Sequence, residues 1–189
     1  MRKLRVLALA PAILVLSLAA CAGAKLSEDK AKERAQAYDP AAVVEKYASV
    51  EITAKVEIKK NTGVFADGGL MSSVVSALKA QAGTHTYEGQ QMAAFVLEAD
   101  DIGDMGDQEG YTITYYSYKS KGLKIETKVD TEEDGMKMKG TTNSYVLDDG
   151  RMEKGDSKMA MSVAASAAGV SMEGELEYTM SQTAKWTAK

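Results

Sequence analysis

Apolar and polar side chains alternate along much of the chain. Between residues 51 and 59, isoleucine, alanine and valine alternate with glutamate, threonine and lysine. The same alternation returns at residues 123–129, 136–139 and 170–180. Successive side chains of a strand point to opposite faces of a sheet, so this period of two predicts strands with one buried and one solvated face.

Turn signals divide the remaining sequence into further segments. Asp149-Gly150 is a strong hairpin signal, because these two residue types favour the backbone conformation of a tight turn. We predict further strands at 86–97, 111–118, 136–147 and 158–164, and further turns at 121–122, 130–135, 155–156 and 166–169. The acidic, glycine-rich segment 100–110 is predicted to be a loop.

Two short segments show the helical period of about 3.6 residues instead. Asp39-Pro40 is a strong helix start, since aspartate caps free backbone N–H groups and proline suits the first turn, and it predicts a helix over 40–48. The second helix is predicted over 70–82, with Gly83 to end it, and its apolar face includes Leu70, Met71, Val74 and Leu78.

These elements predict an α+β fold that is mainly antiparallel β. A curved sheet or half-barrel with short helices over its concave face satisfies the pattern, and a β-sandwich, which gives the same alternation, is the alternative. In the curved sheet, helix 70–82 acts as a lid or plug over a groove. The side chains predicted to line that groove are Ile52, Val56, Ile125, Met136, Met138, Met172 and Leu176.

The amino-terminal segment has the three parts of a secretory signal peptide: a basic start, an apolar run over 6–18 and small residues after it. The next four residues, Leu18-Ala19-Ala20-Cys21, resemble the lipobox of bacterial lipoproteins. This resemblance implies that residues 1–20 are removed and that Cys21 is acylated on its thiol and new amino terminus. Several acyl chains give stable anchoring, so the implied partner of Cys21 is a membrane.

The lipobox resemblance also implies a location in the cell envelope. Ala22 stands where an aspartate resembles an inner-membrane retention signal, which favours the outer membrane in a Gram-negative cell. Residues 21–39 are interpreted as an acylated tether, a solvated helix or loose spacer with few large apolar side chains to bury. The β-rich domain is then expected over 40–189.

Composition removes several classes of function. One cysteine allows neither an internal disulfide nor a cysteine-based zinc site, and one histidine excludes sites that need two imidazoles. The formal charge of −4 argues against a nucleic-acid partner. His85 is interpreted as a solvated turn residue and the carboxylates of 100–109 as a solvated loop. We therefore expect no enzyme, catalytic residue, metal or cofactor, and the sequence names no protein partner.

Methionine is enriched, and two pairs, Met136/Met138 and Met159/Met161, are spaced two residues apart. On a strand each pair lies on one face, and thioethers are soft ligands for Cu(I). Filling of a sheet core or a plastic groove explains the same residues. Four thioethers meet only if the two strands pair in register.

The order of elements resembles the half-barrel lipoproteins of the LolA/LolB type and their mycobacterial lipid-binding relatives. The features that resemble them are the helix opening at Asp39-Pro40, the strand after it, a helical insertion before a later meander, and the strand-and-hairpin rhythm of 119–126 and 144–150. We expect a non-enzymatic envelope lipoprotein that binds a lipid or other apolar ligand in its groove. The alternative is a structural or surface-interaction lipoprotein with a closed core, and a periplasmic Cu(I)-binding module is a third hypothesis.

Overall fold

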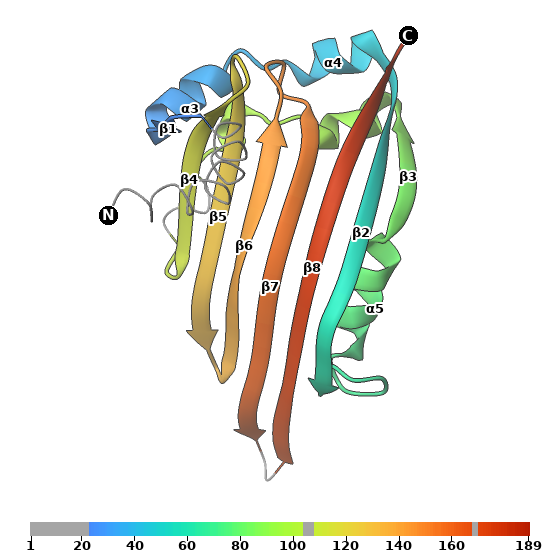
Figure 1. The fold of residues 1–189 in the computed structure, drawn as a ribbon, viewed down its shortest axis with the longest axis vertical. Coiled ribbons are helices and arrows are strands. Elements are labelled where there is room, and N and C mark those ends of the chain that lie inside the picture. The colour runs from blue at the N-terminus through green and yellow to red at the C-terminus, as the bar shows by residue number, and fades with distance from the viewer. Residues whose placement is uncertain (1–22, 104–107, 168–169) are drawn as a thin grey trace, which may run out of the picture.

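The computed structural model describes residues 23–103, 108–167 and 170–189, so the leader and Cys21 lie outside the described residues. Eight strands form one antiparallel sheet in the order β1-β4-β5-β6-β7-β8-β2-β3 (Figure 1). The strands are β1 (Lys25–Leu26), β2 (Tyr47–Gly63), β3 (Gly83–Glu88), β4 (Tyr111–Tyr118), β5 (Gly122–Glu133), β6 (Met136–Val146), β7 (Met152–Ala167) and β8 (Val170–Ala188).

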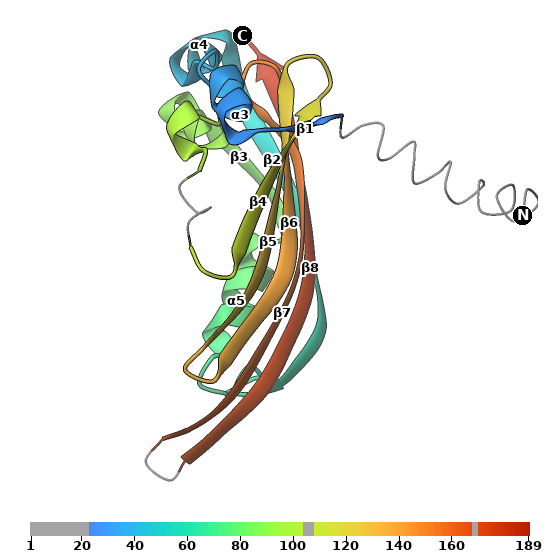
Figure 2. The same ribbon diagram turned by 90° about the vertical axis from the view of Figure 1, so that its left-hand side faces the viewer.

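The sheet is curved, and the helices lie on its concave side (Figure 2). Among the described residues, three helices are α-helical and two are short 3-10 helices: α3 (Glu28–Ala35), α4 (Pro40–Lys46), α5 (Ser72–Gln81), η1 (Gly89–Phe95) and η2 (Ala99–Asp101). The predicted α+β class with a curved antiparallel sheet is confirmed. The sandwich alternative is wrong for the described residues, because all their strands belong to a single open sheet.

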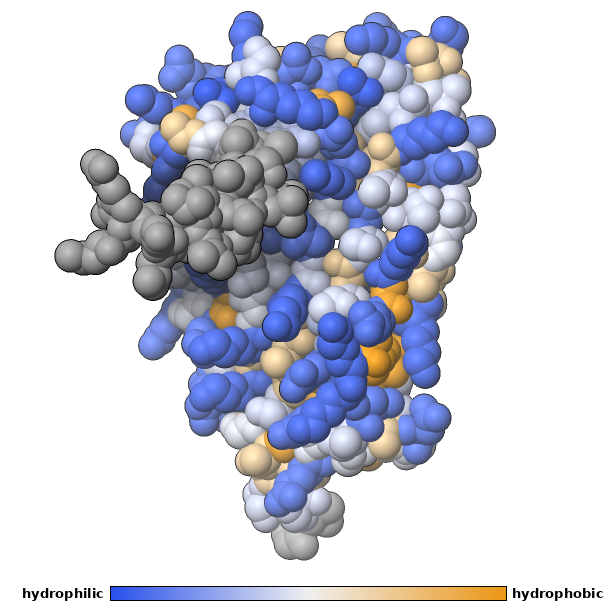
Figure 3. Space-filling model, in the orientation of Figure 1, coloured by the Kyte–Doolittle hydropathy of each residue, from blue (hydrophilic) through white to orange (hydrophobic). Residues whose placement is uncertain are grey.

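The two faces of the sheet differ as the alternation predicts. On the convex face, residues that lie side by side on neighbouring strands are mostly charged or carry a hydroxyl. For instance, Lys128 of β5 pairs with Thr141 of β6, which pairs with Lys158 of β7. Figure 3 shows this face, where hydrophilic residues predominate. Ion pairs such as Asp130–Lys139 join neighbouring strands there. The apolar partners of these rows face the helices.

Three hydrophobic clusters occupy the concave side. Two lie at the upper end of the view in Figure 1, one where α3 packs on β4 and β5 around Leu123, and one where α4 and η1 pack on β2 around Val50 and Met92. The third lies at the lower end, between α5 and strands β2, β7 and β8, around Phe65 and Leu176. Each helix therefore covers its own part of the sheet.

Two predicted elements are wrong. The strand expected over 86–97 ends at Glu88, because Gly89 adopts a left-handed φ of 56° and the chain continues as η1, whose Met92 is buried under α4. The turn expected at Gly155-Asp156 is absent from the described chain. These residues continue β7, and Gly155 pairs with β6 on one side and β8 on the other. Pairing with two neighbours overrides the local turn signal.

The segment interpreted as a tether packs against the sheet from Lys25 onward. Lys25 and Leu26 pair with β4, and Ser27 caps α3, since its side chain accepts a hydrogen bond from the Lys30 N–H. Ala31 and Ala35 are fully buried against the sheet. Small side chains let a helix approach the sheet closely. The segment therefore buries one face of α3 although it has few large apolar side chains. Within the described residues, the segment before residue 40 therefore belongs to the folded domain and is not a free tether.

Candidate functional site

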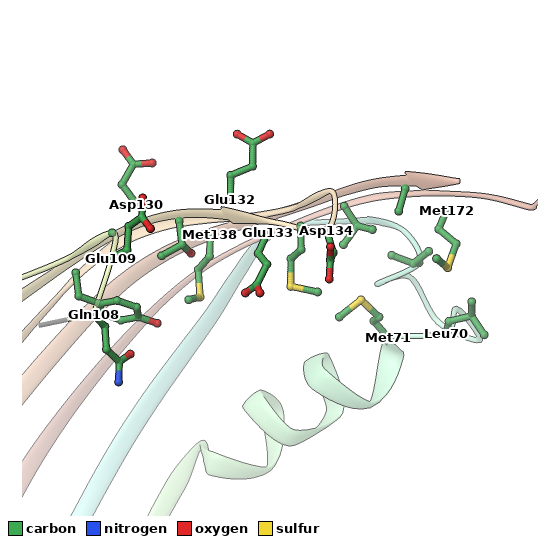
Figure 4. Close-up of a pocket in the computed structure, with 17 residues that line it drawn as sticks. Leu70, Met71, Gln108, Glu109, Asp130, Glu132, Glu133, Asp134, Met138 and Met172 are labelled. Carbon is green, nitrogen blue, oxygen red and sulfur yellow. The ribbon is translucent and has the colours of Figure 1, made fainter. Parts of the chain in front are cut away.

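A groove of about 1050 Å³ opens at the lower end of the concave face, beside the start of α5. Its walls come from the ends of β5 and β6, from β7 and β8, and from the loop before α5 (Figure 4). The lining residues are Val64, Leu70, Met71, Gln108, Glu109, Gly110, Tyr111, Asp130, Thr131, Glu132, Glu133, Asp134, Met136, Met138, Val163, Ala165 and Met172.

The β5–β6 hairpin forms one wall of this groove. Its turn residues Asp134 and Gly135 both have positive φ, 49° and 77°, which matches the right-handed twist of a two-residue hairpin. This turn fixes the register, so Glu133 lies opposite Met136 and Thr131 opposite Met138. Methionines of β6 and one glutamate of β5 therefore share the concave face at the hairpin end.

The loop between β2 and α5 forms the facing wall. Its Val64 N–H donates to the carbonyl of Glu173 at 2.9 Å, and the Met71 N–H donates to the carbonyl of Val64 at 2.8 Å. Phe65 is fully buried in the lower cluster and anchors the loop. These contacts hold the loop on β8 and place Leu70 and Met71 at the groove.

Methionine supplies much of the apolar lining. Met71 precedes α5, Met136 and Met138 belong to β6, and Met172 belongs to β8, and all four border the same space. Figure 4 shows the thioethers of Met71, Met138 and Met172 around it. Met136 is 36% exposed and Leu70 is 77% exposed, so this apolar surface is open to solvent. Unbranched thioether side chains adapt to ligands of varied shape, which makes the wall suited to apolar binding.

Carboxylates form the rim of the groove. Figure 4 shows the Glu133 carboxylate on the same side of the strands as the Met138 side chain, and the Asp130 and Glu132 carboxylates on the other side. Lys139 Nζ donates to Asp130 Oδ2 at 2.7 Å, and this hydrogen bond lowers the pKa of Asp130 below its usual value. Lys137 Nζ donates to Glu132 Oε2 at 3.3 Å. Asp130 and Glu132 thus face their lysine partners and not the groove.

The groove contains part of the predicted set. Met136, Met138 and Met172 line it, as do Leu70 and Met71 of the predicted lid. Sequence reasoning missed Val163 and Ala165 of β7, although their odd-numbered positions share a face with Met161 and hence with Met138. Period-two alternation extended along β7 would have found them.

The other predicted groove residues lie in packed clusters. Ile52 belongs to the cluster under α4, and Ile125 packs against the cluster under α3. Val56 and Leu176 pack under α5, together with Val74 and Leu78 of the predicted lid. Alternation places all these side chains on the concave face but does not say which part of that face a helix covers.

The paired methionines are staggered. Met138 lies opposite Met161, whereas Met136 lies opposite Val163 and Met159 opposite Gly140. All four share the concave face, but the register forms one facing pair and not two. Within the described residues, no group of three or more histidine, cysteine, aspartate or glutamate side chains is arranged to hold a metal ion.

The remaining candidates lie apart from the groove. His85 is exposed on the edge strand β3, opposite Ile52. In the acidic segment, Asp100 and Asp101 belong to η2, where the Asp101 side chain accepts a hydrogen bond from the Glu98 N–H at 2.8 Å. Residues 104–107 of that segment lie outside the described residues.

Comparison with known proteins gives no relative for this chain: no family model matches it, and neither the curated proteins nor the solved structures include a similar chain. Every helix in the described part of the chain falls short of the length and apolar character needed to span a bilayer.

Proposed function

We propose that this protein is a non-enzymatic lipoprotein of the cell envelope that binds a lipid or another apolar ligand in the groove beside α5. The observation that carries the proposal is the solvent-open space of about 1050 Å³ bordered by Met71, Met136, Met138 and Met172. A pocket of this size matches those that bury small-molecule ligands.

The packing of α5 supports the same conclusion. Val75 and Leu78 are buried against the sheet, so the helix is seated firmly on β2, β7 and β8. It leaves the hairpin end of β5 and β6 beside it uncovered. An apolar surface that the fold leaves open, next to apolar surface that it covers, is typical of a binding site.

A bulky side chain introduced into the groove tests whether the groove binds apolar ligands. Residues 23–189 contain every described element and all three clusters, and binding of the neutral fluorescent probe N-phenyl-1-naphthylamine to this chain reports on apolar sites. Ala165→Trp places a large ring in the groove, and we expect it to weaken probe binding at least about tenfold. Ala164→Trp is the matched control, because the exposed Ala164 side chain points to the convex face one residue earlier. Equal affinity of both variants would contradict the proposal.

The envelope location rests on Leu18-Ala19-Ala20-Cys21. Metabolic labelling of cells with an alkyne fatty acid, followed by mass spectrometry of the amino-terminal peptide, tests it directly. We expect label on Cys21 and loss of residues 1–20, with no label in Cys21→Ser. A labelled Cys21→Ser protein, or an unlabelled wild type, would exclude the anchor.

The alternative is a structural or surface-interaction lipoprotein that holds no ligand. The three clusters fill much of the concave side, which is the observation in its favour. Native mass spectrometry of the same chain separates the two functions: co-purified lipid supports the groove, and a bare protein that also fails to bind the probe supports the alternative.

A further inference from the structure

The groove carries charge of one sign only. Five of the described residues that border it are acidic and none is lysine, arginine or histidine, but Asp130 and Glu132 point to the other side of the strands. The convex face, in contrast, mixes both signs, with pairs such as Asp130–Lys139 and Glu132–Lys137. The described lining of the groove therefore lacks the lysines that accompany Asp130 and Glu132 on the convex face.

Three of the five carboxylates have no lysine partner. Asp130 and Glu132 are bonded to lysines on the convex side. No ion pair joins Glu109, Glu133 or Asp134 to any residue that the structure describes. Glu133 lies directly opposite Met136, so one uncompensated negative charge borders the methionine wall itself.

We propose that the natural ligand of the groove is a cationic amphiphile, an apolar chain that carries an amine or quaternary ammonium group. This inference rests on the proposed function, because it assigns a ligand class to the same groove. The chain would lie on the methionine and valine wall, and its positive group would lie at Glu133 with Glu109 and Asp134 nearby. A fatty acid or an anionic phospholipid would bring its negative charge to the same rim and be repelled.

The test compares three amphiphiles with the same twelve-carbon chain and different charge. Dodecyltrimethylammonium, dodecyl maltoside and dodecanoate, all below their micellar concentrations, displace N-phenyl-1-naphthylamine from residues 23–189. At low ionic strength we expect the cation to bind about tenfold more tightly than dodecanoate, with the maltoside between them. The ratio should shrink at about 0.3 M salt, because salt screens exposed charges.

A pair of charge-matched variants locates the preference. The double variant Glu109→Gln/Glu133→Gln removes two charges at the groove. We expect the ratio of the affinity for the cation to that for dodecanoate to fall to about two, while the affinity for the maltoside stays constant. Glu173→Gln with Glu177→Gln removes two exposed charges on β8 outside this groove, and this control should keep the wild-type ratio.

The outcomes distinguish a failure of the proposed function from a failure of the cationic ligand alone. If the probe and all three amphiphiles fail to bind, the proposed function is wrong. If the maltoside binds but the wild-type protein does not prefer the cation, or both double variants change the ratio equally, the groove stands and the cationic ligand is wrong. Circular dichroism of each variant confirms that it is folded.

Discussion

The upper end of the concave face and the groove at its lower end differ in what covers the sheet. At the upper end α3, α4 and η1 bury side chains of fixed shape, among them Leu123, Val50 and Tyr38. At the groove, the strands carry Met136 and Met138 on the same face, but no described helix covers them. One sheet thus has a closed upper end and a lower end where the part beside α5 stays open.

This difference separates stability from binding. Side chains without exposed surface contribute through burial and close packing, so the upper end carries a large share of the folding free energy. Half-exposed methionines bury less surface and repack easily, so they contribute little to stability and remain available to a ligand. Four substitutions or titrations test this division.

The largest effect is expected at the upper end. Leu123 is fully buried beneath α3, so Leu123→Ala creates a cavity and should lower the free energy of unfolding by about 3 kcal/mol. Urea unfolding followed by circular dichroism measures this change. A loss below about 1 kcal/mol would mean that the upper end is loosely packed and that the comparison fails.

Alkaline pH should also lower the free energy of unfolding, through a buried tyrosine at the upper end. Burial raises the pKa of Tyr38 to about 12, from about 10 in the unfolded chain, and the hydroxyl donates to the carbonyl of Lys121 at 3.1 Å. The folded state retains this proton at pH values where the unfolded state loses it, so the contribution is complete below pH 10 and is lost as the pH rises towards 12.

The size of the alkaline effect follows from the two pKa values. The loss approaches about 2–3 kcal/mol near pH 12, because each pKa unit corresponds to roughly 1.4 kcal/mol. Urea titrations at pH 9, 10 and 11 compare wild type with Tyr38→Phe, which lacks the titrating hydroxyl. Identical pH slopes for the two proteins would show that Tyr38 ionises freely in the folded state.

A smaller effect is expected at the start of α4. Asp39 Oδ1 accepts hydrogen bonds from the N–H groups of Ala41 at 2.9 Å and Ala42 at 3.2 Å. Asp39→Ala should therefore cost about 1 kcal/mol, measured by the same unfolding method. Asp67→Ala, in the exposed loop before α5, removes the same charge without a cap and should cost much less.

The smallest effect belongs to the groove. Met136 is 36% exposed, so Met136→Ala should change the free energy of unfolding by no more than about 0.5 kcal/mol. The same variant should weaken probe binding. A variant that is strongly destabilised but binds normally would reverse the roles assigned to the two ends.

The sequence predicts faces better than it predicts positions along a face. The strand predicted at 111–118 has the bounds of β4, and Asp149-Gly150 lies at the predicted hairpin, because both signals are local. Periodicity alone predicts Ile125 and Met138 in one groove, since both face the concave side. They lie in different environments because α3 covers Ile125 and no described helix covers Met138. Helix placement depends on tertiary packing that periodicity does not encode.

The position of the acidic rim at the groove cannot be predicted from the sequence, for a related reason. Glu133 belongs to a run of four acidic or polar residues, 131–134, that a local reading interprets as a solvated turn. Its role at the groove depends on the register with β6 and on the side of the sheet to which it points. The neighbouring Glu132 has the same side chain but faces the other way. The buried face of α3 is equally hard to predict from the sequence, because Ala31 and Ala35 are apolar but small.

The pairing of β1 with β4 has a consequence for how an anchored molecule stands on a bilayer. Lys25 and Leu26 are fixed on the sheet edge against Tyr116 and Tyr115. In a protein acylated at Cys21, residues 22 and 23 alone would separate the anchor from the sheet, because the Ala24 carbonyl accepts a hydrogen bond from the Ser117 N–H, and the connection would span at most about 10 Å. β1 lies towards the upper end and the groove at the lower end (Figure 1). If Cys21 is acylated as proposed, so short a connection would keep the end of the sheet near β1 close to the headgroups and leave the groove at the end farther from the membrane.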